Sequence, residues 1–327
     1  MKTVLVTGGT GFIGSNLAEA LLGEGCQVRI LRRRDSDLRM IESLDVEQVV
    51  GDVRDRDSLR RAMNGCDTVF HTAAIVSHWK KERPLMFEVN VGGTHNVVET
   101  CLELGVLRLI HTSSTAAVGF PENGSLADET IRFNWEPYDV GYRQSKHEAE
   151  KEIHRGVQLG LDAVMVNPTV VIGPRDVHFH GGQLIRDIYR KKIFYYVRGG
   201  MSITYVGDIV RGHILAARRG RTGERYILSG QNLSHREIIS IIAEVVGGIR
   251  PMFRMPSAAV RTVTFLAESA AGLLDRKPWV TRELLAGSDL NYHFSCRKAQ
   301  TDLGYSFTPL REAVQKTFDW YMKHALL

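Results

Sequence analysis

The sequence predicts an α/β fold, a doubly wound parallel sheet with a smaller, mostly helical second lobe, and three observations support it. Short apolar runs alternate with helix-length segments through the first half of the chain, a pattern that indicates right-handed βαβ units and a parallel sheet covered on both faces. A glycine-rich stretch, VTGGTGFIGS at 6–15, follows the first apolar run. The 327 residues are 43% hydrophobic and 24% charged, which is typical of a globular protein with a sizeable core.

The elements of the first half follow one another in alternation. Apolar runs predict strands at 3–7, 27–31, 46–50, 67–72 and 107–113. Helical patterns separate them at 12–22, 55–64 and 85–104, and a helix at 141–159 and a strand at 162–168 extend the alternation. After Pro174 the alternation loosens, and we expect a loop at 177–182, a strand at 224–228, and helices at 183–191, 207–218, 234–247, 257–274 and 309–323.

The glycine-rich stretch matches G-x-G-x-x-G at 9–14, and Gly8 adds a second register of glycines at 8, 11 and 14. It follows an expected strand and opens an expected helix, which is the context in which this motif binds a dinucleotide. Glycine lets the backbone approach a pyrophosphate, and the amides at the helix N-terminus favour its negative charge. We therefore expect a Rossmann-type sheet, with a tight turn that binds nothing as the alternative; the expected contacts from the motif are Gly8, Thr10, Gly11 and Gly14.

Two lobes that exchange chain segments without a flexible linker follow from this order of elements. Residues 1–173 are expected to form the dinucleotide-binding domain, and 204–229 are expected to return to it. The remaining segments, 174–203 and 230–327, are expected to form a substrate-binding lobe.

Charge, cysteine content and hydropathy narrow the classes of partner. The net charge is only +5, with basic and acidic residues interspersed, so we expect no nucleic acid partner. Four cysteines without C-x-x-C spacing or neighbouring histidines argue against zinc and for reduced thiols in a cytoplasmic protein. No charged segment followed by a cleavable apolar stretch is visible before the strand that begins at Thr3, so we expect no signal peptide. Polar residues interrupt the apolar stretch 258–274, so we expect a surface amphipathic helix and no stable membrane insertion, with membrane contact as the weaker alternative.

Three arginines, Arg32, Arg33 and Arg34, stand where the second strand is expected to end. NAD-binding proteins commonly have an acidic residue there for the ribose 2′-hydroxyl, whereas guanidinium groups suit a 2′-phosphate. NADP(H) is therefore favoured, with Arg32 and Arg33 as its contacts. Asp35, just downstream, leaves NAD(H) as an alternative cofactor. If no cofactor binds here, the three arginines form a solvated basic turn. Asp52, after the third strand, is placed to accept the adenine amino group, although such residues are more often turn residues.

A catalytic group is expected where Tyr142 and Lys146, four residues apart, share one face of the helix at 141–159. A nearby ammonium lowers the pKa of a tyrosine, which would let Tyr142 move protons near neutral pH. Ser113, Ser114 and Thr115 end the fifth strand, at the sheet edge where open α/β folds bind ligands. A hydroxyl there can bind a substrate carbonyl. As the non-catalytic alternatives, the tyrosine and lysine would be ordinary surface residues, and the three hydroxyls would cap a helix or form a turn.

These motifs together resemble those of an extended short-chain dehydrogenase/reductase of the NAD-dependent epimerase/dehydratase superfamily. The resemblance covers essentially the whole chain, and the family's order is kept by TGGTGFIGS, the Asp after the third strand, TAA, VNVGGTHNVVE, HTSSTAAVG, Y-x-x-x-K and NPTVVIGP. The segments VNPTVVIGPRD and GERYILSGQNLS are most similar to the branch of dihydroflavonol-reductase-like proteins and hopanoid-associated sugar epimerases.

The resemblance implies roles for single residues. Tyr142 would be the proton donor or acceptor, and Lys146 would bind the nicotinamide ribose and tune the tyrosine. Ser114 would orient the substrate, with Thr115 as its substitute. The family also implies a homodimer formed through the helices at 85–104 and 141–159. The implied cofactor contacts are Gly8, Gly11, Phe12, Ile13, Asp52, Val53, Ala73, Ala74, Pro168 and Val171.

The family machinery leaves the substrate open. Nucleotide-sugar members carry an Arg-Asp pair where this chain has Ile203 and Thr204, and many have Arg in place of Asn167. With the NADP preference, these departures favour a reductase that transfers hydride to the carbonyl of a small or medium apolar ketone or aldehyde. The aromatic residues expected beside that substrate are Trp79, Phe179, Phe194, Tyr195 and Tyr196, with packing between the lobes as the alternative.

Two further readings stay open at this point. An NAD-dependent nucleotide-sugar epimerase or dehydratase is the alternative, for which Arg186, Arg198 and Arg297 are the candidate diphosphate contacts. A non-catalytic NADP-binding sensor is disfavoured, because the chain keeps both the tyrosine and the lysine. His178 and His180 have no evident third partner, so we expect no metal.

Overall fold

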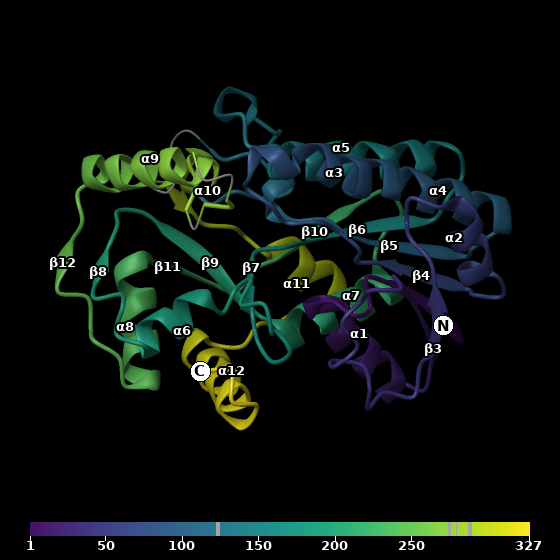
Figure 1. Cartoon of the computed structure of the whole chain (residues 1–327). Helices are drawn as coiled ribbons and strands as arrows, with labels where there is room; N and C mark the ends of the chain where they lie inside the picture. The colour runs from purple at the N-terminus through teal and green to yellow at the C-terminus, as the bar shows by residue number, and fades with distance from the viewer. Residues whose placement is uncertain (122–124, 274–275, 279, 287–289) are drawn as a thin grey trace.

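Seven parallel strands form the main sheet in the computed structural model, which describes all residues except 122–124, 274–275, 279 and 287–289 (Figure 1). The strand order is β10–β6–β5–β4–β1–β2–β3. The chain therefore reverses its direction of winding between β1 and β4, and ligands of open α/β sheets bind at such a point, beyond the carboxyl ends of the strands. The strands are β1 (Thr3–Thr7), β2 (Gln27–Arg32), β3 (Glu47–Val50), β4 (Thr68–His71), β5 (Arg108–Thr112), β6 (Ala163–Pro168) and β10 (Arg225–Leu228).

Both faces of this sheet are covered by helices, because the strands carry apolar residues on both sides. Val4 and Val6 of β1 lie in the core beneath α1 and α7, whereas Leu5 lies in the core beneath α2, α4 and α5. The predicted doubly wound α/β fold is thus confirmed. The helices are α1 (Phe12–Gly23), α2 (Arg56–Met63), α4 (Gly93–Leu104), α5 (Gly141–Gln158), α7 (Val206–Arg219) and α11 (Arg297–Leu303).

The helix expected at 85–104 is divided. It consists of α3 (Arg83–Phe87), a wide π-helical turn at Glu88–Gly92, and α4. Within the wide turn, the Asn90 side chain accepts from the backbone N–H of Ile75 at 2.8 Å and donates to its carbonyl at 2.9 Å. This turn therefore holds the segment after β4, which borders the cavity described below.

The part of the chain outside the main sheet and its covering helices, called the second lobe below, contains more strand than the sequence predicts. β7 (Val170–Ile172), β9 (Gly200–Tyr205), β11 (Gln231–Ser234) and β13 (Asn291–Tyr292) form one sheet, and β8 (Tyr195–Tyr196) pairs with β12 (Phe253–Arg254). These strands are too short to give a clear alternating pattern. Around them lie α6 (Gln183–Tyr189), α8 (His235–Val246), α9 (Ser257–Leu273), α10 (Arg282–Leu285) and α12 (Leu310–Lys323), and short helical turns occur at Lys80–Glu82, Thr115–Ala117 and Glu136–Tyr138.

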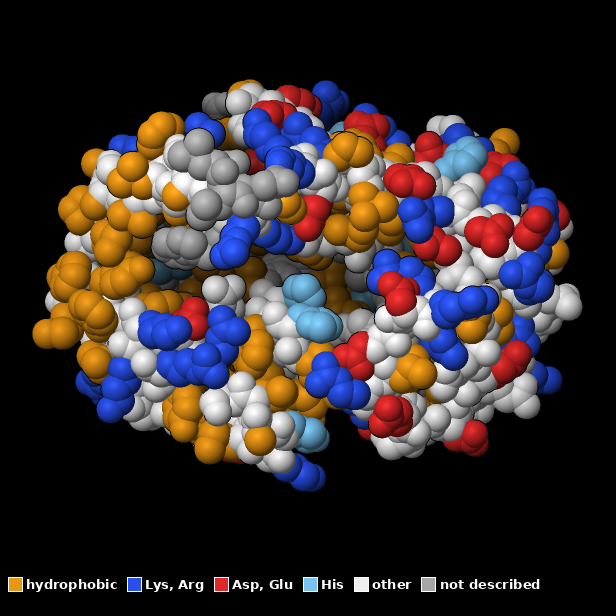
Figure 2. Space-filling view, viewed as in Figure 1, with side chains coloured by type: hydrophobic (Ala, Val, Ile, Leu, Met, Phe, Trp, Pro, Cys, Tyr) orange, Lys and Arg blue, Asp and Glu red, His pale blue; other side chains and the backbone are white. Residues whose placement is uncertain are grey.

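Figure 2 shows a hollow across the middle of the visible face of the molecule. Helix α9, which contains residues 258–273 of the apolar stretch, lies at one end of the molecule (Figure 1), and residue 274 of the predicted helix lies outside the described residues. Across the described ranges, no helix combines the length and apolarity needed to cross a membrane. The division of the chain into two exchanging lobes stays a prediction.

Candidate active site

A cavity of about 940 Å³ lies at the carboxyl ends of the central strands. Gly8 follows β1, Thr72 follows β4, Ser113 follows β5 and Thr169 follows β6, and all four line the cavity. This position is the switch point of the sheet, where the fold favours ligand binding. Of the residues that the sequence predicted for the cofactor, the structure places all along this cavity: Gly8, Thr10, Gly11, Phe12, Ile13, Gly14, Arg32, Arg33, Asp52, Val53, Ala73, Ala74, Lys146, Pro168 and Val171.

The glycine loop is packed too closely for side chains. Gly8 has φ +69°, and a Cβ there would lie 2.7 Å from the backbone of Ala73. A Cβ on Gly14 would lie 2.2 Å from the Gly8 carbonyl oxygen. No side chain caps the start of α1, whose N-cap is Gly11, so the first amides of the helix remain available to an anion. The loop therefore fits the pyrophosphate of a dinucleotide.

The far end of the cavity is basic. Arg32, Arg33 and Ser36 line it, whereas the Asp35 side chain is 78% exposed and does not belong to the lining. Asp52 lies beside them, and Arg54 pairs with it at 2.9 Å. That guanidinium lowers the pKa of Asp52, so its carboxylate is charged at neutral pH. The residues present suit the adenosine half of a dinucleotide.

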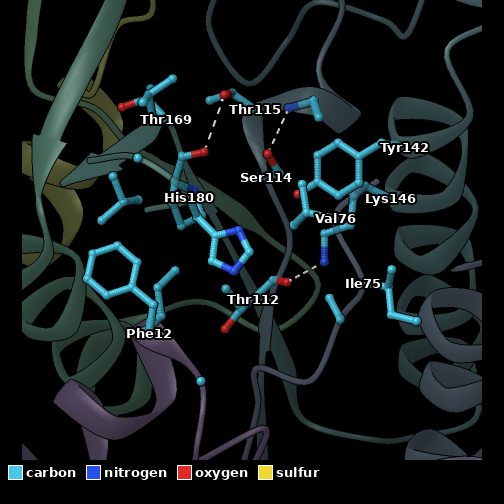
Figure 3. Close-up of a pocket in the computed structure, with 18 of the residues that line it drawn as sticks. Phe12, Ile75, Val76, Thr112, Ser114, Thr115, Tyr142, Lys146, Thr169 and His180 are labelled. Atoms are coloured by element: carbon cyan, nitrogen blue, oxygen red, sulfur yellow. Dashed lines mark hydrogen bonds between the residues drawn. The ribbon is translucent and has the colours of Figure 1, made fainter. Parts of the chain in front are cut away.

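Ser114, Tyr142 and Lys146 meet in the middle of the cavity (Figure 3). Tyr142 and Lys146 lie one turn apart on α5, and Ser114 lies beside Tyr142 and acts to lower its pKa. Ser114 also caps the short turn that follows β5, accepting from the backbone N–H of Ala116 at 3.1 Å. The Lys146 Nζ donates to the Thr112 carbonyl at 2.7 Å. Ser114 can therefore cap the short turn and still present its hydroxyl to the cavity.

The expected effect of Lys146 on Tyr142 is corrected by the structure. Burial raises the pKa of Tyr142 above its usual value, and the opposing effect of Ser114 does not outweigh it. Lys146 is itself buried, which lowers its pKa to about 8. The amine of Lys146 is directed to the Thr112 carbonyl. The spacing of Tyr142 and Lys146 in the sequence does not report burial, which dominates the pKa of both groups.

A buried polar network behind Lys146 was not predicted. Glu150, one turn further along α5, accepts from Ser113 at 2.5 Å, from Asn167 at 2.6 Å and from Arg225 at 3.2 Å. Asn167 also donates to the Ser114 carbonyl at 2.9 Å. The negative charge of Glu150 raises the pKa of Lys146, opposing the effect of burial. The network thus ties the loop after β5 to α5 and supports the charged lysine.

Two of the aromatic residues predicted for the substrate, Trp79 and Phe179, lie elsewhere, which corrects that part of the expectation. Phe179 packs against Tyr321 with ring centroids 5.0 Å apart, in the core of the second lobe, and Trp79 lies beneath Lys81. Neither belongs to the cavity lining. Thr115 does line it, but its hydroxyl is directed to the Pro168 carbonyl at 3.3 Å.

The substrate end of the cavity includes Tyr195 and Tyr196, which the sequence predicted beside the substrate, together with residues that sequence reasoning did not assign. His78 stands beside Tyr142 with ring centroids 6.0 Å apart, and burial lowers its pKa to about 4. The Arg143 guanidinium lies 3.6 Å from the centroid of the Trp135 ring. His180 points into the cavity (Figure 3), and in the described ranges no group of three His, Cys, Asp or Glu could hold a metal. The apolar part of this wall is Ile75, Val76, Leu184, Ile193, Tyr195, Tyr196, Val197, Met201, Ile238, Ile239, Leu284, Leu285, Tyr292 and Phe294.

A family model described as the NAD dependent epimerase/dehydratase family matches residues 4–229. The chain belongs to this family. A Synechocystis sp. protein that carries the name of a dihydroflavonol 4-reductase is 35% identical over 98% of this chain and 94% of its own length. Sterol demethylase protein B of Methylococcus capsulatus is 31% identical over 99% of this chain and 100% of its own. The crystal structure of gox2253 matches with a TM-score of 0.88, at 36% identity and full coverage of both chains.

Membership in the NAD dependent epimerase/dehydratase family confirms the resemblance drawn from the motifs, and with it an enzyme with oxidoreductase chemistry. The matched region ends at residue 229, just after β10, the last strand to join the main sheet. Part of the apolar cavity wall lies beyond it, at Ile238, Ile239, Leu284, Leu285, Tyr292 and Phe294. The family match alone therefore does not determine the substrate, and the residues that line the cavity must indicate it.

Proposed function

We propose that this protein is an NADP(H)-dependent oxidoreductase that reduces the carbonyl of a small to medium apolar ketone or aldehyde. The observation that carries the proposal is the meeting of Ser114, Tyr142 and Lys146 in one cavity whose substrate end is largely apolar. The relatives named for a dihydroflavonol and for a sterol support a ring-shaped, apolar substrate.

The nicotinamide, when bound, supplies the hydride. Ser114 and Tyr142 donate hydrogen bonds to the substrate carbonyl oxygen, which orients it and stabilises its developing negative charge. The Tyr142 hydroxyl then gives its proton to that oxygen. Its raised pKa keeps the hydroxyl protonated at neutral pH, which suits a proton donor. The charged Lys146 stabilises the phenolate that remains, and the apolar wall excludes water.

Removing the charge of Glu150 should shift the pH dependence of this reaction. Lys146 loses its proton near pH 8, so we expect kcat/KM for reduction to fall as pH rises through that value. Because Glu150 raises the pKa of Lys146, Glu150→Gln should move the fall to lower pH by about one unit. Glu150→Asp, which keeps the charge, should restore most of the profile. If Glu150→Gln lowers the rate but does not move the pH profile of kcat/KM, Glu150 has only a structural role.

NADP(H) is favoured because two arginines and a serine line the adenosine end, while Asp35, which is 78% exposed and pairs with Arg33 at 3.5 Å, does not line it. We expect Arg33→Ser to weaken NADPH binding by about ten- to a hundredfold, since hydrogen bonds to a charged group are lost. NADH binding should be unchanged. Arg61→Ser, at an exposed position on α2 outside the cavity lining, is the matched control. Equal losses for both cofactors in Arg33→Ser would contradict the preference.

The nucleotide-sugar alternative is less well supported. Arg186 pairs with Asp187 and stacks over Phe179, and neither it nor Arg198 or Arg297 lines the cavity. Isothermal titration with NADPH, NADH and a nucleoside-diphosphate sugar separates the two readings. Tight NADPH binding without a response to the sugar is expected. NAD retained through purification, together with binding of the sugar, would favour the epimerase.

We further propose a homodimer formed through α4 and α5, in a cytoplasmic protein. The dimer rests on the family resemblance, and the location is supported by four buried, free thiols at Cys26, Cys66, Cys101 and Cys296. Light scattering of the purified protein measures the oligomeric state directly.

A further inference from the structure

Helix α9 turns its apolar residues outward. Val263, Phe265 and Leu266 are 47%, 54% and 60% exposed. Thr264, between them, is 2% exposed, and its hydroxyl donates to the Val260 carbonyl at 2.8 Å. A surface helix normally buries its apolar side and exposes its polar side. This helix does the opposite over these residues.

The neighbouring strand β12 extends the same exposed surface. Met252 and Phe253 are 75% and 49% exposed. The Phe253 ring lies 6.1 Å from that of Phe194, centroid to centroid, and the Met252 N–H donates to the Phe194 carbonyl at 2.8 Å. Figure 2 shows hydrophobic side chains gathered at this end of the molecule. The apolar end is defined here as Phe194, Met252, Phe253, Val263, Phe265 and Leu266.

Positive charge predominates around the apolar end, and Glu268 of α9, just beyond Leu266, is paired with Arg282 at 2.5 Å. Residues 188–207 and 247–267 include arginines and lysines and no Asp or Glu. Their exposed cations include Arg190, Lys191, Lys192, Arg250 and Arg254. Arg250 pairs with Glu244 at 2.9 Å. For the other four, no carboxylate of the described residues lies within ion-pair distance. An apolar surface ringed by cations is complementary to an anionic lipid surface.

The apolar end is continuous with the substrate end of the cavity. Phe253 and Arg254 of β12 pair with Tyr195 and Tyr196 of β8, and both tyrosines line the cavity. On the other side, Leu284 of α10 lines the cavity and is also 51% exposed. The same elements therefore form the exposed surface on one side and the apolar cavity wall on the other.

We propose that the apolar end docks on a lipid bilayer that contains anionic lipids. The exposed aromatic and aliphatic side chains enter the boundary between headgroups and acyl chains, and the flanking cations bind the headgroups. A second copy of the chain is a poorer occupant, because a symmetric contact would bring two sets of like charges together. If the proposed function holds, on which this last step rests, the substrate is an apolar molecule that reaches the cavity from the bilayer.

Vesicle flotation of the full-length protein tests the docking surface. We expect the protein to float with vesicles of phosphatidylcholine and phosphatidylglycerol. Flotation should fall by about tenfold or more with phosphatidylcholine alone or at high salt, because the cations then lose their partners. The double variant Met252→Ser/Leu266→Ser should lose binding to a similar extent. Leu107→Ser is the matched control, since Leu107 is 72% exposed at the start of β5, outside the apolar end.

Three readouts make the result decisive. Wild-type protein that stays unbound with anionic vesicles would overturn the proposal, and so would a double variant that floats as well as the wild type. A double variant that changes from dimer to monomer in light scattering, with flotation unchanged, would assign the surface to a second copy. Titration with NADPH, together with thermal melting, is made on every variant. If the wild-type protein floats with the vesicles but does not bind NADPH, the proposed function is wrong and the docking surface is still supported.

Discussion

Replacing Tyr142 by Phe is expected to lower kcat for carbonyl reduction by about 10²- to 10⁴-fold, the range that a positioned proton donor contributes. The substitution removes only the hydroxyl, which lies beside Ser114. The ring stays in place beside His78, so NADPH affinity and thermal stability should change little. Steady-state kinetics with NADPH consumption, beside a binding titration, measures both quantities.

Tyr138→Phe is the control for this experiment. Tyr138 is 43% exposed and lies outside the cavity lining, so its variant should retain full activity. Activity in Tyr142→Phe within a few-fold of the wild type would show that another group donates the proton.

Replacing Gly14 by Ala is expected to reduce the affinity for the dinucleotide by about a hundredfold or more, or to prevent folding. The new Cβ would lie 2.2 Å from the Gly8 carbonyl oxygen, a backbone atom, so the loop and α1 must separate. Separation moves the first amides of α1 away from the place where a pyrophosphate binds. Binding titration and circular dichroism distinguish a lost contact from a lost fold.

Gly23→Ala is the matched control, in the same helix. A Cβ on Gly23 meets nothing within 4 Å, so this variant should bind normally and gain up to about 1 kcal/mol in free energy of unfolding. Unchanged NADPH affinity in Gly14→Ala would mean that the loop is not the cofactor cradle.

The first half of the fold could be predicted because its signals are local. β1, the glycine loop and α1 follow one another within a single apolar and glycine-rich stretch, and each strand that follows is short, apolar and bounded by a helix. Gly14 is required by a contact with Gly8, six residues earlier. Tyr142 and Lys146 share one helix face by spacing alone. Such features depend on short stretches of chain.

The rest depends on contacts between distant residues. Glu150 meets Arg225, 75 residues further along, and no local pattern marks that pair. The pKa values of Tyr142 and Lys146 are set by burial, which sequence spacing does not report. Trp79 and Phe179 have the character expected of substrate contacts, but their surroundings direct them elsewhere. The two-residue strands β8 and β12 exist only because they pair with each other.

The central claim is that NADPH hydride is transferred to an apolar carbonyl in this cavity. The most direct measurement is to incubate the protein with NADPH deuterated at C4 and a panel of apolar ring ketones, and to analyse the products by mass spectrometry. The account predicts deuterium on the carbinol carbon of at least one alcohol, and almost none with Tyr142→Phe. No labelled alcohol from any ketone, with epimerisation of a nucleoside-diphosphate sugar by the same preparation, would contradict it.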